Sequence, residues 1–286
     1  MKKFLIPSLI TLFLFSCSKE ITIDLPAPDK KIVVDGGIFV GKPAEINLTW
    51  STGYFEPVDS ASLANYLISN ATVYVKDGNM TDTLHIGYDP NRVIPIVWIG
   101  STILGQVGHT YELTVIAEGR TATSTTTIRN PVLLDSAWFQ VEGTLDSLGY
   151  AWAHLSDPPG QNNGYRWYAK RLNKDADFLV PYGAATDDKF YDGTSFDFAY
   201  NRPVLNGSTA TDDNNIERYY YKRGDTIVIQ FCSIGQAEVN FFRTYESVVS
   251  SNGNPFAAPG TIKTNVTGGL GIFCGYSPSF DTIICH

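Results

Sequence analysis

Carboxylates crowd one stretch in the second half of this 286-residue chain. Asp187, Asp188 and Asp192 lie within six residues, inside a segment spanning residues 175–215 that is rich in Asp, Asn, Gly and Ser. Oxygen-rich loops can wrap Ca²⁺ with carboxylate and carbonyl ligands. The spacing does not match an EF-hand, and a solvated acidic loop has the same composition. The sequence therefore predicts a solvated acidic loop with no metal, the three aspartates are the alternative calcium candidates, and no resident cofactor is expected.

Flat aromatic side chains could contact a ligand by stacking. Trp152 and Trp167 lie in strand-like runs, and Tyr219, Tyr220 and Tyr221 follow one another directly. Such rings can support a glycan ring or an interface hot spot, although tryptophans of a β-sandwich more often fill its core. Successive residues of a strand point to opposite faces, so the three tyrosines cannot all be buried on one side. These five residues are the candidate ligand contacts.

The four cysteines divide between two chemistries. Cys17 ends an apolar leader and is placed for lipidation, which leaves Cys232, Cys274 and Cys285. An oxidising cell envelope permits one disulfide among these and leaves one thiol over. Cys274 and Cys285 flank the turn-like residues 277–279 and could face each other on paired strands, so they are the expected pair. A disulfide between Cys232 and Cys274 is the open alternative.

The usual signatures of catalysis are missing from the sequence. The four histidines are His85, His109, His154 and His286, and none belongs to a His-Glu-x-x-His zinc motif. There is no Gly-x-Ser-x-Gly nucleophile elbow and no phosphate-cradling glycine loop with lysine. The sequence therefore predicts a protein that is not an enzyme.

The amino terminus has the layout of a bacterial lipoprotein signal. Lys2 and Lys3 precede an apolar run over residues 4–15, which is too short for a membrane-spanning helix of about 20 residues. The run ends in Leu14-Phe15-Ser16-Cys17, which resembles a lipobox whose cysteine receives diacylglycerol. Residues 1–16 are thus predicted to be a removable signal and residues 17–31 a lipidated tether. Ser18-Lys19-Glu20 resembles a short charged signal for the cell surface.

Charge and composition exclude one class of partner and favour one fold class. With 21 basic and 29 acidic side chains the net charge is −8, which is the wrong sign for binding nucleic acid. Aromatic residues make up 13% of the chain, with 25 glycines and 15 prolines, which favours strands and turns. The sequence predicts a mainly β protein that binds no nucleic acid.

The order of the predicted elements suggests two parts. About seven short strands between residues 32 and 128 fit an immunoglobulin-like β-sandwich, and the clearest is a hairpin that turns at Glu118-Gly119. Asn130-Pro131 marks the boundary, so the predicted units are residues 32–130 and a larger β-rich domain over residues 131–286. The second unit holds a long acidic loop at residues 175–215 and one short helix at residues 237–249. Its last strands are expected at residues 270–276 and 282–285.

Several short motifs, in order, resemble one family of Bacteroidota lipoproteins, catalogued as domain of unknown function 4249. The motifs are Ile23-Asp24-Leu25-Pro26, Val33-Val34-Asp35-Gly36, Ala71-Thr72-Val73, residues 108–115, Ser156-Asp157-Pro158-Pro159-Gly160, Phe190-Tyr191-Asp192-Gly193 and residues 265–273. The resemblance covers nearly all residues after Cys17. It implies an outer-membrane lipoprotein often encoded beside TonB-dependent transporters, and it supplies no catalytic residues.

Two non-enzymatic roles follow as expectations. The first is a lipid-anchored protein of the outer membrane, at the cell surface or facing the periplasm, that assists a TonB-dependent transporter in capturing a nutrient. The alternative is a structural or adhesive surface protein. In both, the lipid on Cys17 binds the outer membrane.

Overall fold

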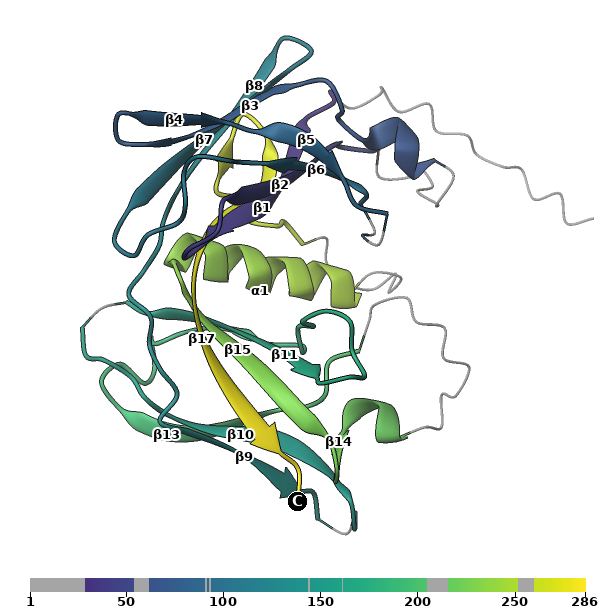
Figure 1. Cartoon of the computed structure of the whole chain (residues 1–286), viewed down its shortest axis with the longest axis vertical. Coiled ribbons are helices and arrows are strands. Elements are labelled where there is room, and N and C mark those ends of the chain that lie inside the picture. The colour runs from purple at the N-terminus through teal and green to yellow at the C-terminus, as the bar shows by residue number, and fades with distance from the viewer. Residues whose placement is uncertain are drawn as a thin grey trace, which may run out of the picture.

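The fold is described from a computed structural model of the chain (Figure 1). The described residues are 29–53, 62–90, 92, 94–143, 145–160, 162–204, 216–251 and 260–286. The predicted signal peptide, Cys17 and the charged signal that follows it lie outside these ranges.

An eight-stranded sheet runs through the whole molecule (Figure 1). Its strands, in spatial order, are β12 (Ala185–Asp187), β11 (Gly164–Arg171), β15 (Thr226–Ile234), β17 (Leu270–Ile284), β1 (Ile32–Phe39), β2 (Ala44–Trp50), β6 (Ile96–Ile99) and β5 (His85–Tyr88). All neighbouring strands are antiparallel except β1 and β17, which are parallel. We call this the central sheet.

Two smaller sheets and one α-helix complete the described fold. The five-stranded sheet contains β16 (Val266–Thr267), β8 (Arg120–Thr127), β7 (Thr110–Ala117), β3 (Thr72–Asp77) and β4 (Met80–Thr83). The four-stranded sheet contains β13 (Ser195–Tyr200), β10 (Leu148–Ser156), β14 (Tyr221–Lys222) and β9 (Ser136–Val141). The helices are α1 (Gln236–Ser251) and two 3-10 turns, η1 (Leu63–Tyr66) and η2 (Ile216–Tyr219).

The alternation of side chains along β17 explains how the layers stack. Phe273 belongs to the core under the five-stranded sheet, and Ile283 to the core under the four-stranded sheet. Ile272, Cys274 and Tyr276 belong instead to the core under α1. Because successive residues of a strand point to opposite faces, both smaller sheets cover one face of the central sheet and α1 covers the other.

The prediction of a mainly β chain with one helix is confirmed. The helix extends over Gln236–Ser251, and within the described residues no helix is long and apolar enough to cross a membrane. The predicted hairpin is formed by β7 and β8. Glu118 and Gly119 both have positive φ, 47° and 74°, which is the conformation of a type I′ hairpin turn.

The expected turn at residues 277–279 is wrong, and so is the disulfide that depended on it. One continuous strand, β17, runs from Leu270 through Pro278 to Ile284. Cys274 and Cys285 therefore lie about 36 Å apart along one extended segment, whereas a disulfide requires Cα atoms within about 7 Å. The alternative pair fails too, because Cys232 is opposite Pro278, about 13 Å along β17 from Cys274. All three cysteines are free and buried.

The central sheet also links the two predicted units. The proposed boundary at Asn130-Pro131 lies between β8 and β9. Beyond it, β16 pairs with β8 and the first half of β17 pairs with β1, so residues 266–276 complete the N-terminal sandwich. The second half of β17 pairs with β15. The division of the chain into residues 32–130 and 131–286 as separate units stays a prediction.

Asp82 at the end of β4 holds the turn that follows β6. Its buried Oδ2 accepts hydrogen bonds from the backbone N–H groups of Ser101, Thr102 and Ile103 at 2.8, 2.9 and 3.0 Å. Burial alone would raise the pKa of Asp82, but the hydrogen bonds, led by that of Ile103, outweigh it and leave the pKa below its usual range. A carboxyl whose folded pKa is depressed stabilises the fold above its unfolded pKa and loses that contribution as the pH falls through the folded value.

Asp82→Asn is therefore expected to lower the free energy of unfolding at pH 7 by about 1–3 kcal/mol. The variant should also lose less stability than the wild type between pH 5 and pH 2. Urea denaturation at several pH values measures both effects. Asp146→Asn, at an exposed position, is the matched control and should leave both quantities unchanged. Equal stability of the Asp82 and Asp146 variants would show that the turn does not depend on this carboxylate.

Candidate functional site

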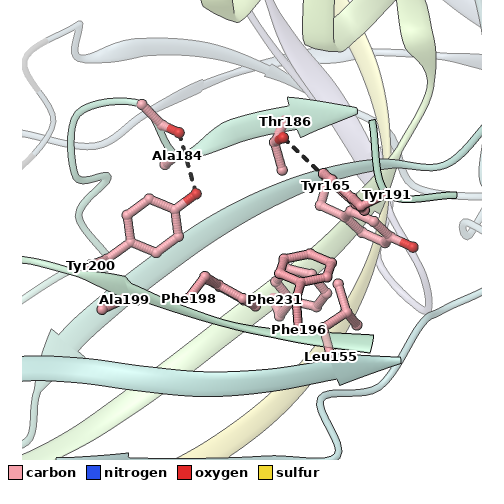
Figure 2. Close-up of a pocket in the computed structure, with 11 residues that line it drawn as sticks. Leu155, Tyr165, Ala184, Thr186, Tyr191, Phe196, Phe198, Ala199, Tyr200 and Phe231 are labelled. Carbon is pink, nitrogen blue, oxygen red and sulfur yellow. Dashed lines mark hydrogen bonds between the residues drawn. The ribbon is translucent and has the colours of Figure 1, made fainter. Parts of the chain in front are cut away.

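An aromatic cavity opens between the central sheet and the four-stranded sheet (Figure 2). Its volume is about 200 Å³. It lies between β12 and β13, which are the terminal strands of their two sheets. The lining residues are Leu155, Tyr165, Gly183, Ala184, Thr186, Tyr191, Phe196, Phe198, Ala199, Tyr200 and Phe231. We call this space the aromatic cavity.

The alternating sequence of β13 builds one wall. Phe196, Phe198 and Tyr200 share one face of the strand and are half-buried, whereas Ser195 and Asp197 point outward and are exposed. The Phe198 ring lies 5.8 Å from both neighbouring rings of the strand, Phe196 and Tyr200. The strand therefore presents a continuous aromatic surface to the cavity.

The opposite wall and the rim come from other elements. Tyr165 of β11 stacks on Phe231 of β15 with ring centroids 5.0 Å apart. Tyr191, in the turn between β12 and β13, lies 4.4 Å from Phe196 across the rim. Figure 2 shows Tyr165, Tyr191, Phe196 and Phe231 gathered around one space.

A few polar groups are placed at the edge of this apolar space. The Tyr200 hydroxyl donates to the Gly183 carbonyl at 3.2 Å, and the Thr186 and Tyr191 hydroxyls are hydrogen-bonded at 3.1 Å (Figure 2). Burial raises the pKa of Tyr191 to about 12 and also raises the pKa of Tyr200. Both phenols stay protonated near neutral pH, so the Tyr200 oxygen, whose hydrogen is donated to Gly183, can accept a hydrogen bond from a ligand, and the Tyr191 hydroxyl can donate or accept one.

The size and lining of the cavity define what it can hold. An apolar cavity of about 150 Å³ is enough to bind benzene. The aromatic cavity is somewhat larger and carries hydroxyl groups, so it can accommodate one flat ring with a polar substituent. The stacked and edge-on aromatic walls suit such a ring.

A group of carboxylates fixes the turn that carries Tyr191. Asp157, Asp188 and Asp192 bring oxygen atoms within 4.8 Å of one another, and the first two are buried. Asp157 Oδ1 accepts from the Tyr165 hydroxyl at 2.5 Å, and its Oδ2 accepts from the Gly193 N–H at 3.1 Å. Asp157 thus ties a wall residue of the aromatic cavity to the turn at its rim.

The other two carboxylates are held in the same way. Asp188 Oδ2 accepts from the Asn163 N–H at 2.7 Å, and Asp192 Oδ1 accepts from the Gly160 N–H at 2.6 Å. These bonds join the turn after β10 to the turn after β12. The three carboxylates could supply oxygen ligands to a cation, and the hydrogen bonds also give them a structural role as an anchor.

The calcium candidates are only partly brought together. Asp188 and Asp192 meet, but their third partner is Asp157, from a turn about 30 residues earlier. The prediction that Asp187 belongs to this group is wrong. Its Oδ2 accepts hydrogen bonds from Gln236 at 3.0 Å and Arg243 at 3.2 Å, both on α1. Calcium binding stays a hypothesis, and a solvated acidic loop without a metal stays the prediction.

The five aromatic candidates occupy different environments. Trp167 as a ligand contact is wrong, because it is fully buried and packs edge-on against Phe198, behind the cavity wall. The prediction that Tyr221 contacts a ligand is wrong for the same reason, since Tyr221 is fully buried in the same core. Tyr219 ends the 3-10 turn η2 and is exposed.

Trp152 and Tyr220 lie on the outer side of the four-stranded sheet. Trp152 stacks beside Trp138 with ring centroids 6.1 Å apart, and Tyr220 lies 5.0 Å from Tyr150. Trp152 and Tyr220 are half-buried and lie outside the aromatic cavity. The cavity itself is not among the features predicted from the sequence, although the alternation of Phe196, Phe198 and Tyr200 was a signal for it.

The thiols and histidines of the described residues are poor catalytic groups. Burial raises the pKa of the Cys232 and Cys285 thiols to about 12 and that of Cys274 well above its usual value, which keeps all three in the unreactive thiol form. His154 pairs with Asp197 at 2.6 Å and His109 with Asp77 at 2.8 Å, both at the surface. In the part of the chain that the structure describes, neither ring is hydrogen-bonded to a serine or cysteine nucleophile.

A comparison with known protein families matches most of the chain. A family model described as Domain of unknown function (DUF4249) matches residues 18–280. The match includes every residue of the aromatic cavity. It also includes Asp157, Asp188 and Asp192, which we call the carboxylate anchor. No curated protein matches the chain.

Proposed function

Because the chain belongs to the DUF4249 family, we propose that it is an outer-membrane lipoprotein with a non-enzymatic role in binding a small ligand. It is anchored through lipid on Cys17 at the cell surface. It holds one ring of the ligand in the aromatic cavity and assists a TonB-dependent transporter in nutrient capture.

The proposal of a membrane anchor rests on the amino-terminal sequence. A basic start, a short apolar run and Leu14-Phe15-Ser16-Cys17 resemble the signal that signal peptidase II and the lipidating enzymes recognise, with Phe15 larger than the residue usual at its position. Several acyl chains on one cysteine bind stably to a membrane, whereas a single chain binds only marginally. The folded part would then stand in water on a tether formed by residues 17–31.

The aromatic cavity is the observation that supports a binding role. Small-molecule sites are concave and mostly apolar, with a few polar groups that set orientation. The cavity has this character, since six of its lining side chains are aromatic and Thr186, Tyr191 and Tyr200 contribute hydroxyls. The carboxylate anchor keeps its rim in place before any ligand arrives, which lowers the entropy cost of binding.

The ring-binding proposal is tested with 4-fluorophenol, observed by ¹⁹F NMR in the presence of the mature lipoprotein in lipid nanodiscs. Thr186→Phe places a ring into the cavity from its rim and should weaken binding by about tenfold or more, equivalent to 1.4 kcal/mol. Ser195→Phe is the matched control, because Ser195 lies on the outward face of the neighbouring strand. It should leave binding unchanged. Equal binding by both variants would contradict the assignment of the cavity.

The transporter is tested separately, by affinity purification of the native lipoprotein in a mild detergent. Reproducible recovery of a TonB-dependent transporter is the expected result. Repeated purification without any such transporter would count against the accessory role and leave the ring-binding result untouched.

The half-buried pair Trp138 and Trp152, on the outer side of the four-stranded sheet, favours a second role in adhesion. Trp138 and Trp152 lie nearly parallel, with 19° between their ring planes, and such flat surfaces suit glycans and protein partners. In this role, cells would attach to a glycan-coated surface even after deletion of neighbouring transporter genes. Replacement of both tryptophans by alanine should then abolish attachment, and unchanged attachment would remove this alternative.

A further inference from the structure

A second cavity lies beside α1, on the face of the central sheet opposite the aromatic cavity. Its volume is about 430 Å³. Tyr245 and Val249 of α1 line it and are 44% and 43% exposed, although they continue the apolar side of the helix. Tyr182, Asn201 and Tyr219 also contribute to its wall. We call this space the α1 cavity.

Arg166 of β11 also lines this cavity, and two nitrogens of its guanidinium group lack a hydrogen-bond partner among the described residues. Only 8% of it is exposed, and its Nε and Nη1 have no hydrogen-bond partner among the described residues. Buried N–H groups are almost always paired, and an unpaired one costs about 1–3 kcal/mol, more when it is charged. The buried Nε and Nη1 of Arg166 therefore need a hydrogen-bond acceptor that the described residues do not supply.

The surroundings of Arg166 hold its side chain in place: Tyr168 is hydrogen-bonded to the guanidinium, but Nε and Nη1 stay without a partner among the described residues. The guanidinium carbon lies 3.4 Å from the Phe242 ring centroid and 5.4 Å from that of Tyr168. Stacking of this kind attracts the cation through the ring face but leaves the in-plane N–H donors available.

The nearest carboxylate, that of Glu246, does not accept a hydrogen bond from Arg166. Glu246 Oε1 is 3.9 Å from Arg166 Nη1, which is beyond hydrogen-bond distance, and Glu246 Oε2 already accepts from the Gly183 N–H at 2.9 Å. Asp35 on β1 interacts with Arg166 only as a charge. These two groups balance the positive charge in part and leave the directional donors unpaired.

We propose that the α1 cavity binds an organic anion whose carboxylate or phosphate pairs with Arg166. The planar fork of arginine matches both groups in two-point hydrogen bonding. The remainder of the ligand packs against Tyr182, Tyr245 and Val249, which gives the exposed side of α1 a function. This site is separate from the aromatic cavity and does not depend on ring binding there.

The test is calorimetric titration of the mature lipoprotein in nanodiscs with benzoate and, separately, with inorganic phosphate at low salt. Benzoate should bind more tightly, because its ring contacts the apolar wall. Tighter binding of phosphate would instead identify the anion as a phosphate group and still support the site. If neither anion binds, the proposal is overturned.

Two substitutions assign the binding to this cavity. Arg166→Gln should weaken benzoate binding by about tenfold or more, in keeping with the loss of a charge-assisted bond, and Arg166→Lys should recover part of it. Arg243→Gln is the matched control, because Arg243 is half-exposed and pairs with Asp187 outside the cavity. Wild-type affinity in Arg166→Gln would overturn the proposal.

A third substitution covers the case in which Arg166→Gln does not fold, as judged by circular dichroism. Val249→Trp leaves Arg166 in place and obstructs the cavity from the exposed side of α1. It should also weaken benzoate binding by about tenfold or more. Unchanged affinity in this folded variant would show that the anion binds elsewhere.

Discussion

Replacing Cys17 by serine is expected to move nearly all of the protein from the membrane fraction to the soluble fraction. The thioether to diacylglycerol cannot form on serine, and each buried CH₂ of the lost chains removes about 0.8 kcal/mol of membrane affinity. Among the described residues, no helix is long and apolar enough to span a membrane. Fractionation and intact-mass measurement of wild type and variant report the change.

Ser18→Ala is the matched control for this experiment. It changes the residue next to the cysteine without removing the thiol, so the protein should remain lipidated and in the membrane fraction. A wild-type mass without diacylglycerol, or membrane association that survives Cys17→Ser, would contradict the lipoprotein assignment.

Asp157→Ala is expected to have the largest effect on stability among the site substitutions. It leaves the Tyr165 hydroxyl and the Gly193 N–H without their acceptor, and it removes the longer bond from Asn163 Nδ2, which also donates to the Pro158 carbonyl. At about 1–3 kcal/mol for each unpaired group, the free energy of unfolding should fall by roughly 2–6 kcal/mol. Binding of 4-fluorophenol should weaken as well, because the turn that carries Tyr191 loses its anchor. Urea denaturation and ¹⁹F NMR measure the two effects.

Asp192→Ala is the comparison for Asp157→Ala. Asp192 is exposed and its Oδ1 accepts from the Gly160 N–H, so its removal should cost no more than about 1.5 kcal/mol. If the two variants are equally stable, Asp157 is not the anchor of the rim.

Local features of the fold could be predicted from the sequence because they depend on neighbouring residues. The hairpin of β7 and β8 follows from alternation and from the Glu118-Gly119 turn. The helix follows from its apolar spacing and lies within two residues of the expected bounds at each end. These elements would form the same way in many folds.

The course of β17 could not be predicted because it depends on partners distant in the sequence. Ser277-Pro278-Ser279 has the composition of a turn, yet the strand continues through it. β1 pairs with β17 only as far as Tyr276, so Pro278 lies where that side of the strand has no neighbour from β1. A proline is tolerated at such an edge, since its missing N–H removes no ladder bond there.

The aromatic cavity was predictable only in part. Within residues 175–215, predicted to be one irregular loop, the structure places β12 and β13. The Phe196, Phe198, Tyr200 alternation indicates β13, but its partner strand β10 is set by pairing over a long sequence separation. The meeting of Asp157 with Asp188 likewise depends on two turns that only the folded sheet brings together.

The central claim, that the aromatic cavity is the ligand site, is tested most directly by soaking crystals of the mature protein with 4-bromophenol. Anomalous scattering locates the bromine atom without reference to any assumed pose. We expect one dominant peak inside the cavity, among Phe196, Phe198 and Tyr200, and no such peak in Thr186→Phe. An empty cavity in the wild type, or a dominant peak elsewhere, would contradict it.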